Sequence, residues 1–512
     1  MMGRVRALLR SLLGSLIAAA LGAGAGRAAE PPSDELAAKA RRGKEAMAAG
    51  RFAEAAGLYA EIVRALPGEP GMLLNLGMAL AMSGRAQEAV PHLQAALKLR
   101  PDLLPASLFL GSANMELGQP ARAVDPLQTV VAAQPDNHDA RQMLADALLS
   151  LERYEPAAQH FRKLSEAAPQ DPRAWYGLGR SYEGLAERPF VELQHTAPDS
   201  PYLLLLVAHA MEAQGKVANA FRLYREALDK RPDFAEAHEG VARIYEQKGQ
   251  PAWAATERAM AKAIPPPDCR SSTLECDFKA GRYPAVWAAA KPVAASERGK
   301  YWLSRAADEM AREAFVRVGQ LPPSPEALLV KVQVLRGQRQ PPGELILEMK
   351  KAVNTWPDDL RLRRELANLL YLVHDLDGAR PLLEDLLKRE PESVDLALQL
   401  GATWLEAQQA SRALPLFEKA VKQEPKRLRA QALLGRAQLE VGNAAEAIVH
   451  LELARETDTD GSLHYQLARA YRATGQADRA SEALRQFQEI QRAAAAESQS
   501  LKEEFQITPP PS

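Results

Sequence analysis

The sequence predicts an all-α protein, an α-solenoid of about 12–13 helical hairpins stacked one on the next. Three observations lead to this fold class. Proline recurs mostly at 34-residue steps, small residues recur at two fixed places within each step, and bulky apolar residues recur at a third. A repeat of this length accommodates one helical hairpin, and such a hairpin buries its apolar face only by packing against its neighbours.

Proline is predicted to close each hairpin. It lacks an N–H group and disfavours α geometry in the residue before it, so it ends the second helix. The closing prolines are Pro67, Pro101, Pro135, Pro169, Pro198, Pro232, Pro266, Pro357, Pro391 and Pro425.

Small residues mark where the two helices of a hairpin are expected to touch. Leu73, Leu76, Gly77 and Leu80 share one helical face, and Ala89, Leu93 and Ala96 share another after the turn at Gly84. Small side chains let the helix backbones approach, and bulky ones fill the space beside them. The same spacing puts Ala at 55, 89, 123, 157, 220, 254, 379, 413, 447 and 480, with Gly or Ala at 43, 77, 111, 145, 208, 242, 367, 401, 435 and 468.

This pattern resembles the tetratricopeptide repeat family, which has small residues at the eighth and twentieth positions, a bulky residue at the twenty-fourth and a closing proline. The resemblance covers residues 34–266 and 326–488. It implies a right-handed superhelix in which the first helices line a concave groove. In this family the groove holds peptides or other proteins.

The N-terminus, residues 1–29, is interpreted as a signal peptide. Arg4, Arg6 and Arg10 precede an apolar stretch over 12–21 and a series of small residues. An uncleaved membrane anchor is the alternative, although the apolar stretch is short for a membrane span. We therefore expect an exported bacterial-type protein, periplasmic or secreted, with no integral membrane span in the mature chain.

The repeat slips at two places. The unit that ends at Pro198 is five residues short, so its second helix, around 189–194, is expected to be stunted. The pattern is mostly lost over 267–325, where helices are predicted at 273–280, 283–290 and 300–318. We interpret 267–325 as an irregular helical joint between an N-terminal array, 34–266, and a C-terminal array, 326–488, and a diverged but regularly stacked repeat is the alternative. Residues 489–512 are predicted to form a capping helix and a disordered tail.

The two cysteines, Cys269 and Cys276, lie in the predicted joint. If Ser272 caps a helix with Glu275 reaching back, the cysteines fall at its start, where a short-loop disulfide is possible in an oxidising compartment. Two buried thiols are the alternative. Two cysteines in all exclude a disulfide-stapled scaffold and a four-cysteine zinc site.

Catalytic and metal-binding signatures are missing from the sequence. The nine histidines are scattered, and there is no phosphate-binding G-x-x-x-x-G-K-[ST] loop and no G-x-S-x-G nucleophile motif. We therefore predict no enzyme, no cofactor and no metal site. The 64 Lys and Arg residues are balanced by 65 Asp and Glu residues, which disfavours nucleic acid as a partner.

The family register predicts which residues face the groove. In the first repeats these residues are apolar and rich in methionine, whose flexible side chain adapts to irregular partners. Contact between superhelical turns, or packing by the N-terminal segment, would produce the same pattern. The residues are Met47, Leu74, Met78, Leu108 and Met115.

Toward the C-terminus the predicted groove becomes basic, which suits acidic segments of a partner. Arg364, Asn368, Gln399 and Arg429 resemble the carboxylate clamp of chaperone-binding tetratricopeptide repeat proteins, although Gln399 replaces Asn and Leu433 lies where the clamp needs a cation. A solvated basic face is the alternative reading. The full set is Arg361, Arg364, Asn368, Gln399, Arg429, Arg436, Arg469 and Arg472.

The function expected from these features is a non-catalytic scaffold that binds peptide or protein segments in its groove. The alternative is a periplasmic adaptor in an envelope secretion or polysaccharide-export assembly. An enzyme with repeat appendages would need a separate non-helical domain, and no stretch of that size is left over.

Overall fold

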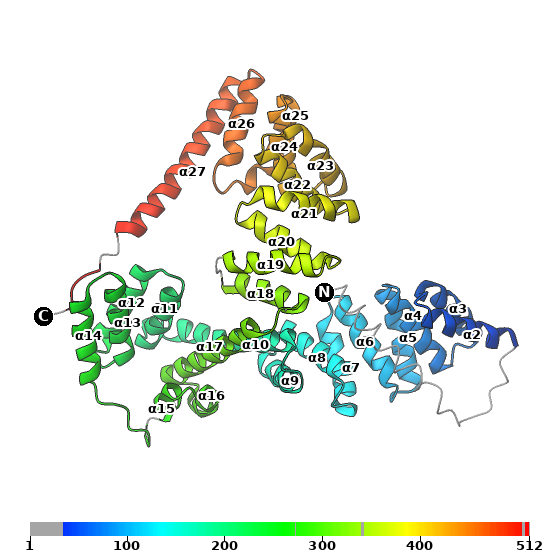
Figure 1. Ribbon diagram of the computed structural model, residues 1–512, viewed down its shortest axis with the longest axis horizontal. Coiled ribbons are helices and arrows are strands. Elements are labelled where there is room, and N and C mark those ends of the chain that lie inside the picture. The colour runs from blue at the N-terminus through cyan, green and yellow to red at the C-terminus, as the bar shows by residue number, and fades with distance from the viewer. Residues whose placement is uncertain (1–33, 272, 339–341, 504–506, 511–512) are drawn as a thin grey trace. The chain divides into compact units, whose positions relative to one another are not determined.

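The computed structural model describes residues 34–271, 273–338, 342–503 and 507–510, and every regular element in these ranges is a helix (Figure 1). The all-α prediction is therefore confirmed. The predicted signal peptide and the capping role of Ser272 lie outside the described residues.

The chain divides into two compact units, and the division does not follow the order of the sequence. The first unit combines the residues up to Pro198 with Pro267–Leu321, and the second combines Asp199–Pro266 with the residues from Pro322 onward. The domain limits expected from the sequence remain a prediction.

The first unit contains the early hairpins and the segment interpreted as a joint. Its helices are α2 (Asp34–Ala48), α3 (Phe52–Ala65), α4 (Pro70–Met82), α5 (Ala86–Leu99), α6 (Leu104–Glu116), α7 (Pro120–Ala133), α8 (His138–Ser150), α9 (Tyr154–Ala167), α10 (Pro172–Thr196), α15 (Thr273–Lys279), α16 (Tyr283–Ala290), the 3₁₀ helix η2 (Lys291–Val293) and α17 (Glu297–Gln320).

The second unit contains the remaining hairpins. Its helices are α11 (Pro201–Ala213), α12 (Val217–Lys230), α13 (Ala235–Gln247), α14 (Pro251–Ala263), α18 (Pro325–Gln338), α19 (Gly343–Thr355), α20 (Leu360–Leu372), α21 (Leu376–Arg389), α22 (Val394–Glu406), α23 (Ala410–Gln423), α24 (Leu428–Glu440), α25 (Ala444–Ala454), the 3₁₀ helix η3 (Arg455–Thr457), α26 (Ser462–Ala473) and α27 (Ala477–Glu503).

Each hairpin is held by the small and bulky residues that the sequence singles out. A Cβ atom on Gly77 of α4 would lie 2.6 Å from the Leu93 side chain of α5, so a side chain at Gly77 would require Leu93 to shift. Gly401 of α22 has the same relation to Phe417 of α23, at 2.5 Å. Leu93 and Phe417 are fully buried. Consecutive hairpins then stack, with α5 packed on α6, α7 on α8 and α23 on α24, which makes the fold a tetratricopeptide-like solenoid.

The turn between the two helices of a hairpin needs a left-handed residue. Glycine supplies it in most hairpins, as at Gly84 (φ 82°) and Gly442 (φ 93°). Glu152, His374 and Gln408 occupy the same place with φ between 56° and 64°. The hairpin turn therefore forms even where the sequence lacks its glycine signal.

The expectation of a stunted second helix around 189–194 is wrong. α10 is one continuous helix of 25 residues that runs through Pro189. The place where other hairpins have a left-handed turn residue is here occupied by Ala186, which favours helix. The Ser304 hydroxyl of α17 donates to the Ala186 carbonyl at 2.9 Å, close to the point where Pro189 interrupts the helical hydrogen bonds.

α17 takes the role of the missing second helix and packs along α10. A Cβ on Gly179 of α10 would lie 2.5 Å from the Phe315 ring of α17, as Gly401 does toward Phe417. Ala311, four residues before Phe315, is buried as the small residue of the pair. α10 and α17 thus form one hairpin whose two helices are separated in sequence by residues 197–296.

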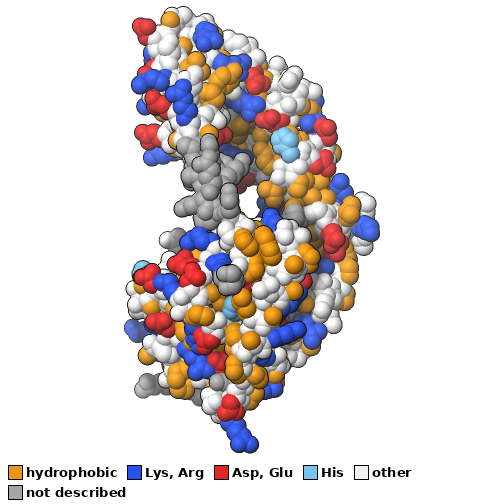
Figure 2. Space-filling view, turned by 90° about the vertical axis from the view of Figure 1, so that its left-hand side faces the viewer, with side chains coloured by type: hydrophobic (Ala, Val, Ile, Leu, Met, Phe, Trp, Pro, Cys, Tyr) orange, Lys and Arg blue, Asp and Glu red, His pale blue; other side chains and the backbone are white. Residues whose placement is uncertain are grey.

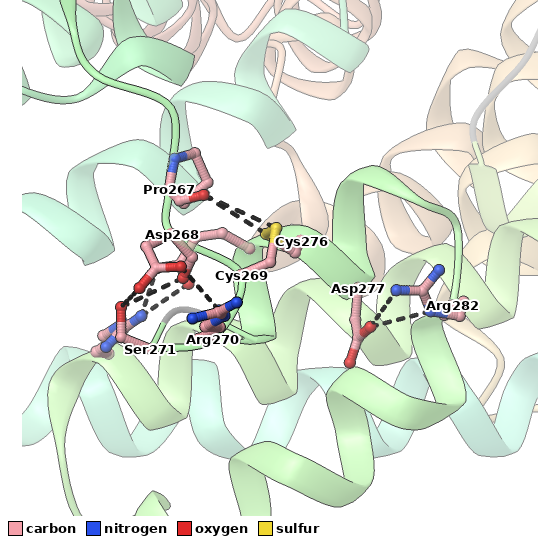
Figure 3. Close-up of a disulfide and its surroundings, with 10 residues drawn as sticks. Pro267, Asp268, Cys269, Arg270, Ser271, Cys276, Asp277 and Arg282 are labelled. Carbon is pink, nitrogen blue, oxygen red and sulfur yellow. Dashed lines mark hydrogen bonds and ion pairs between the residues drawn. A yellow bond between two sulfur atoms is a disulfide. The ribbon is translucent and has the colours of Figure 1, made fainter.

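The helices predicted over 267–325 are confirmed as α15, α16 and α17, and α17 is longer than expected. Cys269 and Cys276 are joined by a disulfide, with their Cα atoms 5.6 Å apart (Figure 3). Glu275 accepts two hydrogen bonds from Arg298 of α17, at 2.6 and 2.7 Å. The disulfide and this ion pair fix α15 at its start and against α17.

Candidate functional site

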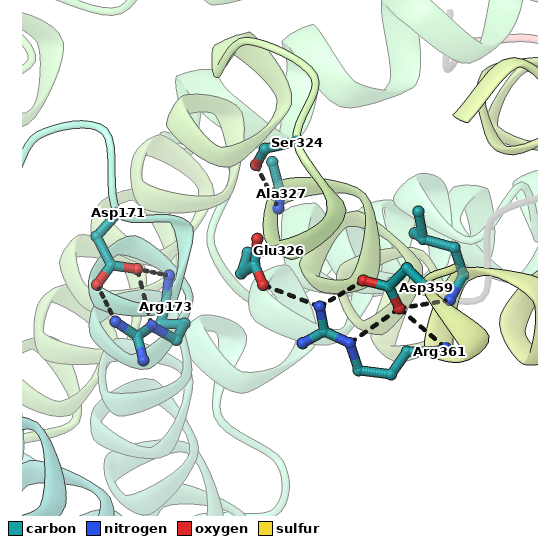
Figure 4. Close-up of polar contacts among 8 residues, drawn as sticks. Asp171, Arg173, Ser324, Glu326, Ala327, Asp359 and Arg361 are labelled. Carbon is teal, nitrogen blue, oxygen red and sulfur yellow. Dashed lines mark hydrogen bonds and ion pairs between the residues drawn. The ribbon is translucent and has the colours of Figure 1, made fainter. Parts of the chain in front are cut away.

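Three of the six predicted arginines, Arg361, Arg364 and Arg436, are paired with acidic side chains of the same unit. Arg361 of α20 donates to Asp359 at 3.0 Å and to Glu326 of α18 at 3.0 Å (Figure 4). The hydrogen bond from Arg361 holds the pKa of Asp359 below its usual range. Arg436 of α24 contacts Glu406 at 2.8 Å and Glu440 at 3.4 Å.

The residues that resemble a carboxylate clamp contact groups of the chain itself. Arg364 donates to both carboxylate oxygens of Glu390, and Gln399 donates to the side-chain oxygen of Asn368 at 2.9 Å. Arg429, the fourth residue of the set, is exposed on α24. A carboxylate that entered this place would therefore have to displace Glu390 from Arg364.

Three of the predicted arginines keep their charge available. Arg429 of α24 and Arg469 and Arg472 of α26, here called the arginine trio, are exposed on neighbouring first helices. Arg469 donates to Gln466 at 2.9 Å. Among the residues that the structure describes, no carboxylate lies within ion-pair distance of the trio. Elsewhere acidic and basic side chains are intermixed on the surface, as Figure 2 shows for one face.

The apolar residues predicted to face the groove in the first unit are less accessible than expected for a bare groove. Met47, Leu74 and Leu108 are buried, and the first two belong to the core cluster of the early hairpins. Met78 and Met115 are half-buried. Only these two side chains offer partial apolar surface at the predicted positions.

A polar cluster joins α11, α12 and α13. Arg243 donates to both oxygens of Glu212 at 2.8 Å, and the Tyr224 hydroxyl donates to Glu212 at 2.6 Å. Burial disfavours ionisation of Glu212, but the hydrogen bonds from Arg243 and Tyr224 outweigh it and hold the pKa of the carboxyl below its usual range. The cluster therefore holds Arg243 in place on the first helix α13, and the charge of Arg243 is paired with that of Glu212.

A second polar contact recurs along the chain, and the sequence analysis did not predict it. The residue six positions after a closing proline donates to, or lies within hydrogen-bond distance of, that proline's carbonyl. The side-chain groups are those of Arg141 at 2.6 Å, Trp175 at 2.9 Å, His238 at 3.1 Å and Gln431 at 2.7 Å. The constant spacing from proline is the signal that could have revealed them.

In three of these hairpins the same residue also contacts a polar group on the following second helix. Arg141 lies 3.3 Å from His160 and Gln431 lies 2.5 Å from His450. His238 lies 2.6 Å from Glu257, whose other oxygen accepts from Arg225 at 3.0 Å. Glu257 is fully buried, and a buried polar group needs hydrogen-bond partners. We therefore interpret these contacts as structural ones that provide such partners at the turn between hairpins.

The described residues contain no group of three or more His, Cys, Asp or Glu side chains placed to hold a metal ion. No helix within them is long and apolar enough to cross a membrane.

Comparison with known proteins identifies repeats in five stretches of the chain. Models described as tetratricopeptide repeat match residues 41–103, 114–180, 207–267, 404–466 and 461–493. A stretch of 109 residues is 29% identical to the mouse (Mus musculus) interferon-induced protein with tetratricopeptide repeats 3, covering 20% of this chain and 27% of that protein. The match thus spans about a quarter of that relative.

Solved structures with similar helical hairpins include the MamA protein, with 22% identity over 39% of this chain and 94% of that chain, at a TM-score of 0.28. A tetratricopeptide repeat protein from Parabacteroides merdae is 15% identical over 65% of this chain and 97% of its own, also at a TM-score of 0.28. Similarity at this level carries no information about function.

Proposed function

Because the chain belongs to the tetratricopeptide repeat family, we propose that it is a non-catalytic scaffold that binds segments of other proteins along the first helices of its hairpins. The observation that supports this most directly is the arginine trio. Three exposed guanidinium groups on two adjacent first helices lack carboxylate partners in the described part of the chain, whereas Arg361, Arg364 and Arg436 are neutralised.

The trio suits an acidic segment. A guanidinium group presents a planar fork of donors that binds a carboxylate through two charge-assisted hydrogen bonds. Arg429, Arg469 and Arg472 can bind without first breaking an internal ion pair. At Arg361, Arg364 and Arg436 a partner would have to displace acidic side chains of the chain, so these residues contribute less.

Apolar contacts are proposed for the first unit. Met78 is the ninth residue of α4 and Met115 is the twelfth residue of α6, the next first helix, and these two helices pack against each other. Their partial exposure would let a partner's apolar side chain contact the thioether groups. Met47, Leu74 and Leu108 support this surface from the core.

Export to an oxidising compartment is part of the proposal. It rests on the charge and hydropathy pattern of residues 1–29 and on the Cys269–Cys276 disulfide, since disulfides persist in such compartments. A mature N-terminus near Glu30 in protein recovered from the periplasm or the medium would support export.

The acidic-partner proposal is tested with a glutamate-rich peptide as probe. Reversing the trio with Arg429→Glu, Arg469→Glu and Arg472→Glu should weaken peptide binding at least ~10-fold, because attraction becomes repulsion at three adjacent sites. Fluorescence anisotropy of the labelled peptide measures this.

A matched control reverses three exposed arginines outside the trio, with Arg64→Glu, Arg122→Glu and Arg188→Glu. Both triple variants change the net charge equally. If the control loses as much affinity as the trio variant, the peptide senses net charge alone and the proposed site is wrong.

A further inference from the structure

The stack formed by α11–α14 ends at α14 without a following hairpin. In the rest of the second unit, the second helix of a hairpin is covered by the first helix of the next, as α21 is by α22 and α25 by α26. Among the described helices of this unit, only its own partner α13 packs on α14 to a comparable extent. Since an uncovered solenoid end exposes apolar surface, the end at α13 and α14 calls for a cap.

Aromatic side chains form this end of the stack. Tyr245 near the end of α13 lies between Phe221 of α12 and Trp253 of α14, with ring centroids 5.5 and 5.4 Å away. The Tyr245 side chain is fully buried, and burial raises the pKa of its hydroxyl to about 12. A buried tyrosine hydroxyl needs a hydrogen-bond partner.

The partner comes from the far end of the sequence. The Tyr245 hydroxyl donates to the carbonyl of Thr508 at 2.6 Å. Residues 507–510, Ile-Thr-Pro-Pro, have no regular secondary structure and lie in the C-terminal part of the chain, where the sequence predicts a disordered tail. These four residues, here called the tail segment, belong to the same unit as α13 and α14.

A polyproline II conformation would account for the burial pattern of the tail segment. Ile507 and Pro510 are half-buried, whereas Thr508 and Pro509 are exposed. This helix has three residues per turn, so residues three apart share one face. It forms no internal hydrogen bonds, which leaves the Thr508 carbonyl free to accept from Tyr245, and such segments dock on aromatic surfaces at low entropic cost.

We propose that the end of the α11–α14 stack, around Tyr245 and Trp253, is a docking site for an extended proline-rich segment, and that the chain's own tail segment occupies it within the same molecule. The site lies apart from the arginine trio and does not depend on groove binding. Covalent connection gives the tail a high effective concentration, so a small contact suffices to hold it as an end cap.

The test observes the tail in the full chain through the Ile507 methyl group, by NMR of protein labelled at isoleucine methyls. In the wild type this signal should have the line width of an ordered side chain. Tyr245→Phe removes only the hydroxyl and should shift the docking equilibrium about 3–10-fold toward the free tail. Trp253→Ala should move the signal to the position of a free isoleucine.

Controls separate docking from folding. Tyr465→Phe removes the hydroxyl of a tyrosine that is 45% exposed on α26, and it should leave the Ile507 signal unchanged. The Ile244 methyl in α13 reports whether the stack itself is intact. A narrow, free-type Ile507 signal in the wild type, or an identical docked signal in Tyr245→Phe and Trp253→Ala, would overturn the proposal.

A second arm supplies the segment in trans. The synthetic peptide Ile-Thr-Pro-Pro-Pro-Ser should bind a full-length Ile507→Gly/Pro510→Gly variant, whose own tail is released, at least ~10-fold more tightly than the wild type, whose site is filled. Equal affinity for both proteins contradicts an intramolecular occupant. So does a concentration-dependent dimer of the wild type that exchanges tails.

Discussion

At the level of single residues, His238 on a first helix and His160 on a second helix take part in the same kind of contact between hairpins but should respond to pH in opposite ways. The hydrogen bond that His238 donates to buried Glu257 raises the pKa of His238. Burial, reinforced by the nearby charge of Arg141, lowers the pKa of His160. One histidine therefore favours the folded state when protonated and the other when neutral.

The expected consequence is a pair of opposite pH profiles. The stability from His238 is fully present below its ordinary pKa of about 6.5 and is lost as pH rises through the raised value. The stability from His160 is present above about 6.5 and is lost as pH falls through the lowered value. Denaturant unfolding of His238→Gln and His160→Gln between pH 5 and 8 measures both. His238→Gln should differ most in stability from the wild type at the acidic end of this range, and His160→Gln at the alkaline end. If the stabilities of both variants changed with pH in the same way, the assigned partners would not control the two histidines.

Sequence periodicity could reveal the residues whose type repeats, and it missed those whose type varies. Gly77, Ala89 and Leu93 recur in kind because steric fit at a helix contact allows few alternatives. The donors to the closing proline carbonyls differ in kind, as Arg141, Trp175, His238 and Gln431, because any long polar side chain reaches that carbonyl. In the sequence only their constant six-residue spacing from a closing proline marks them.

At the level of helices, the pairing of α10 with α17 is the main departure from the sequence-based expectation. Local patterns placed both helices correctly, since helix-forming residues and prolines act over short distances. They could not show that Phe315 fills the place beside Gly179, because residues 197–296 intervene. The short repeat that ends at Pro198 was a real signal, and it marked the loss of a second helix rather than a stunted one.

The split hairpin makes a quantitative prediction. Phe315→Ala should lower the free energy of unfolding of the first unit by about 3–5 kcal/mol, as expected when a buried phenylalanine of a hairpin leaves a cavity. Val316 is the neighbouring residue on α17 and is 47% exposed, so Val316→Ala should change stability by no more than about 0.5 kcal/mol. Denaturant unfolding compares the two. If both substitutions lowered the free energy of unfolding by a similarly small amount, Phe315 would not be the bulky residue of the hairpin, and α17 would not replace the missing second helix.

Helix stacking also decided which candidate site residues remain available. The sequence placed Arg361, Arg364 and Arg436 on first helices and predicted a basic groove. It could not foresee their pairing with Glu326, Glu390 and Glu406, because these carboxylates come from other parts of the chain at irregular sequence distances. Formal charge counts therefore overstate how basic this surface is.

At the level of the whole molecule, stability should be local. Each hairpin buries its apolar face on its own partner helix and on its neighbours in the stack, so loss of one contact should spread only to adjacent hairpins. This differs from a globular domain with a single core, where a core mutation lowers protection throughout the unit. The repeated small and bulky residues are the physical basis of this expectation.

Amide hydrogen exchange on Phe417→Ala, followed by mass spectrometry, tests this claim most directly. Phe417 is fully buried in α23 and packs on Gly401 of α22. Protection should fall most in α22 and α23, less in the neighbouring α21 and α24, and remain unchanged in α2–α9. A uniform fall in protection across the described helices, or no fall in α22 and α23, would contradict the account of a chain built from hairpins that are stabilised by their neighbours.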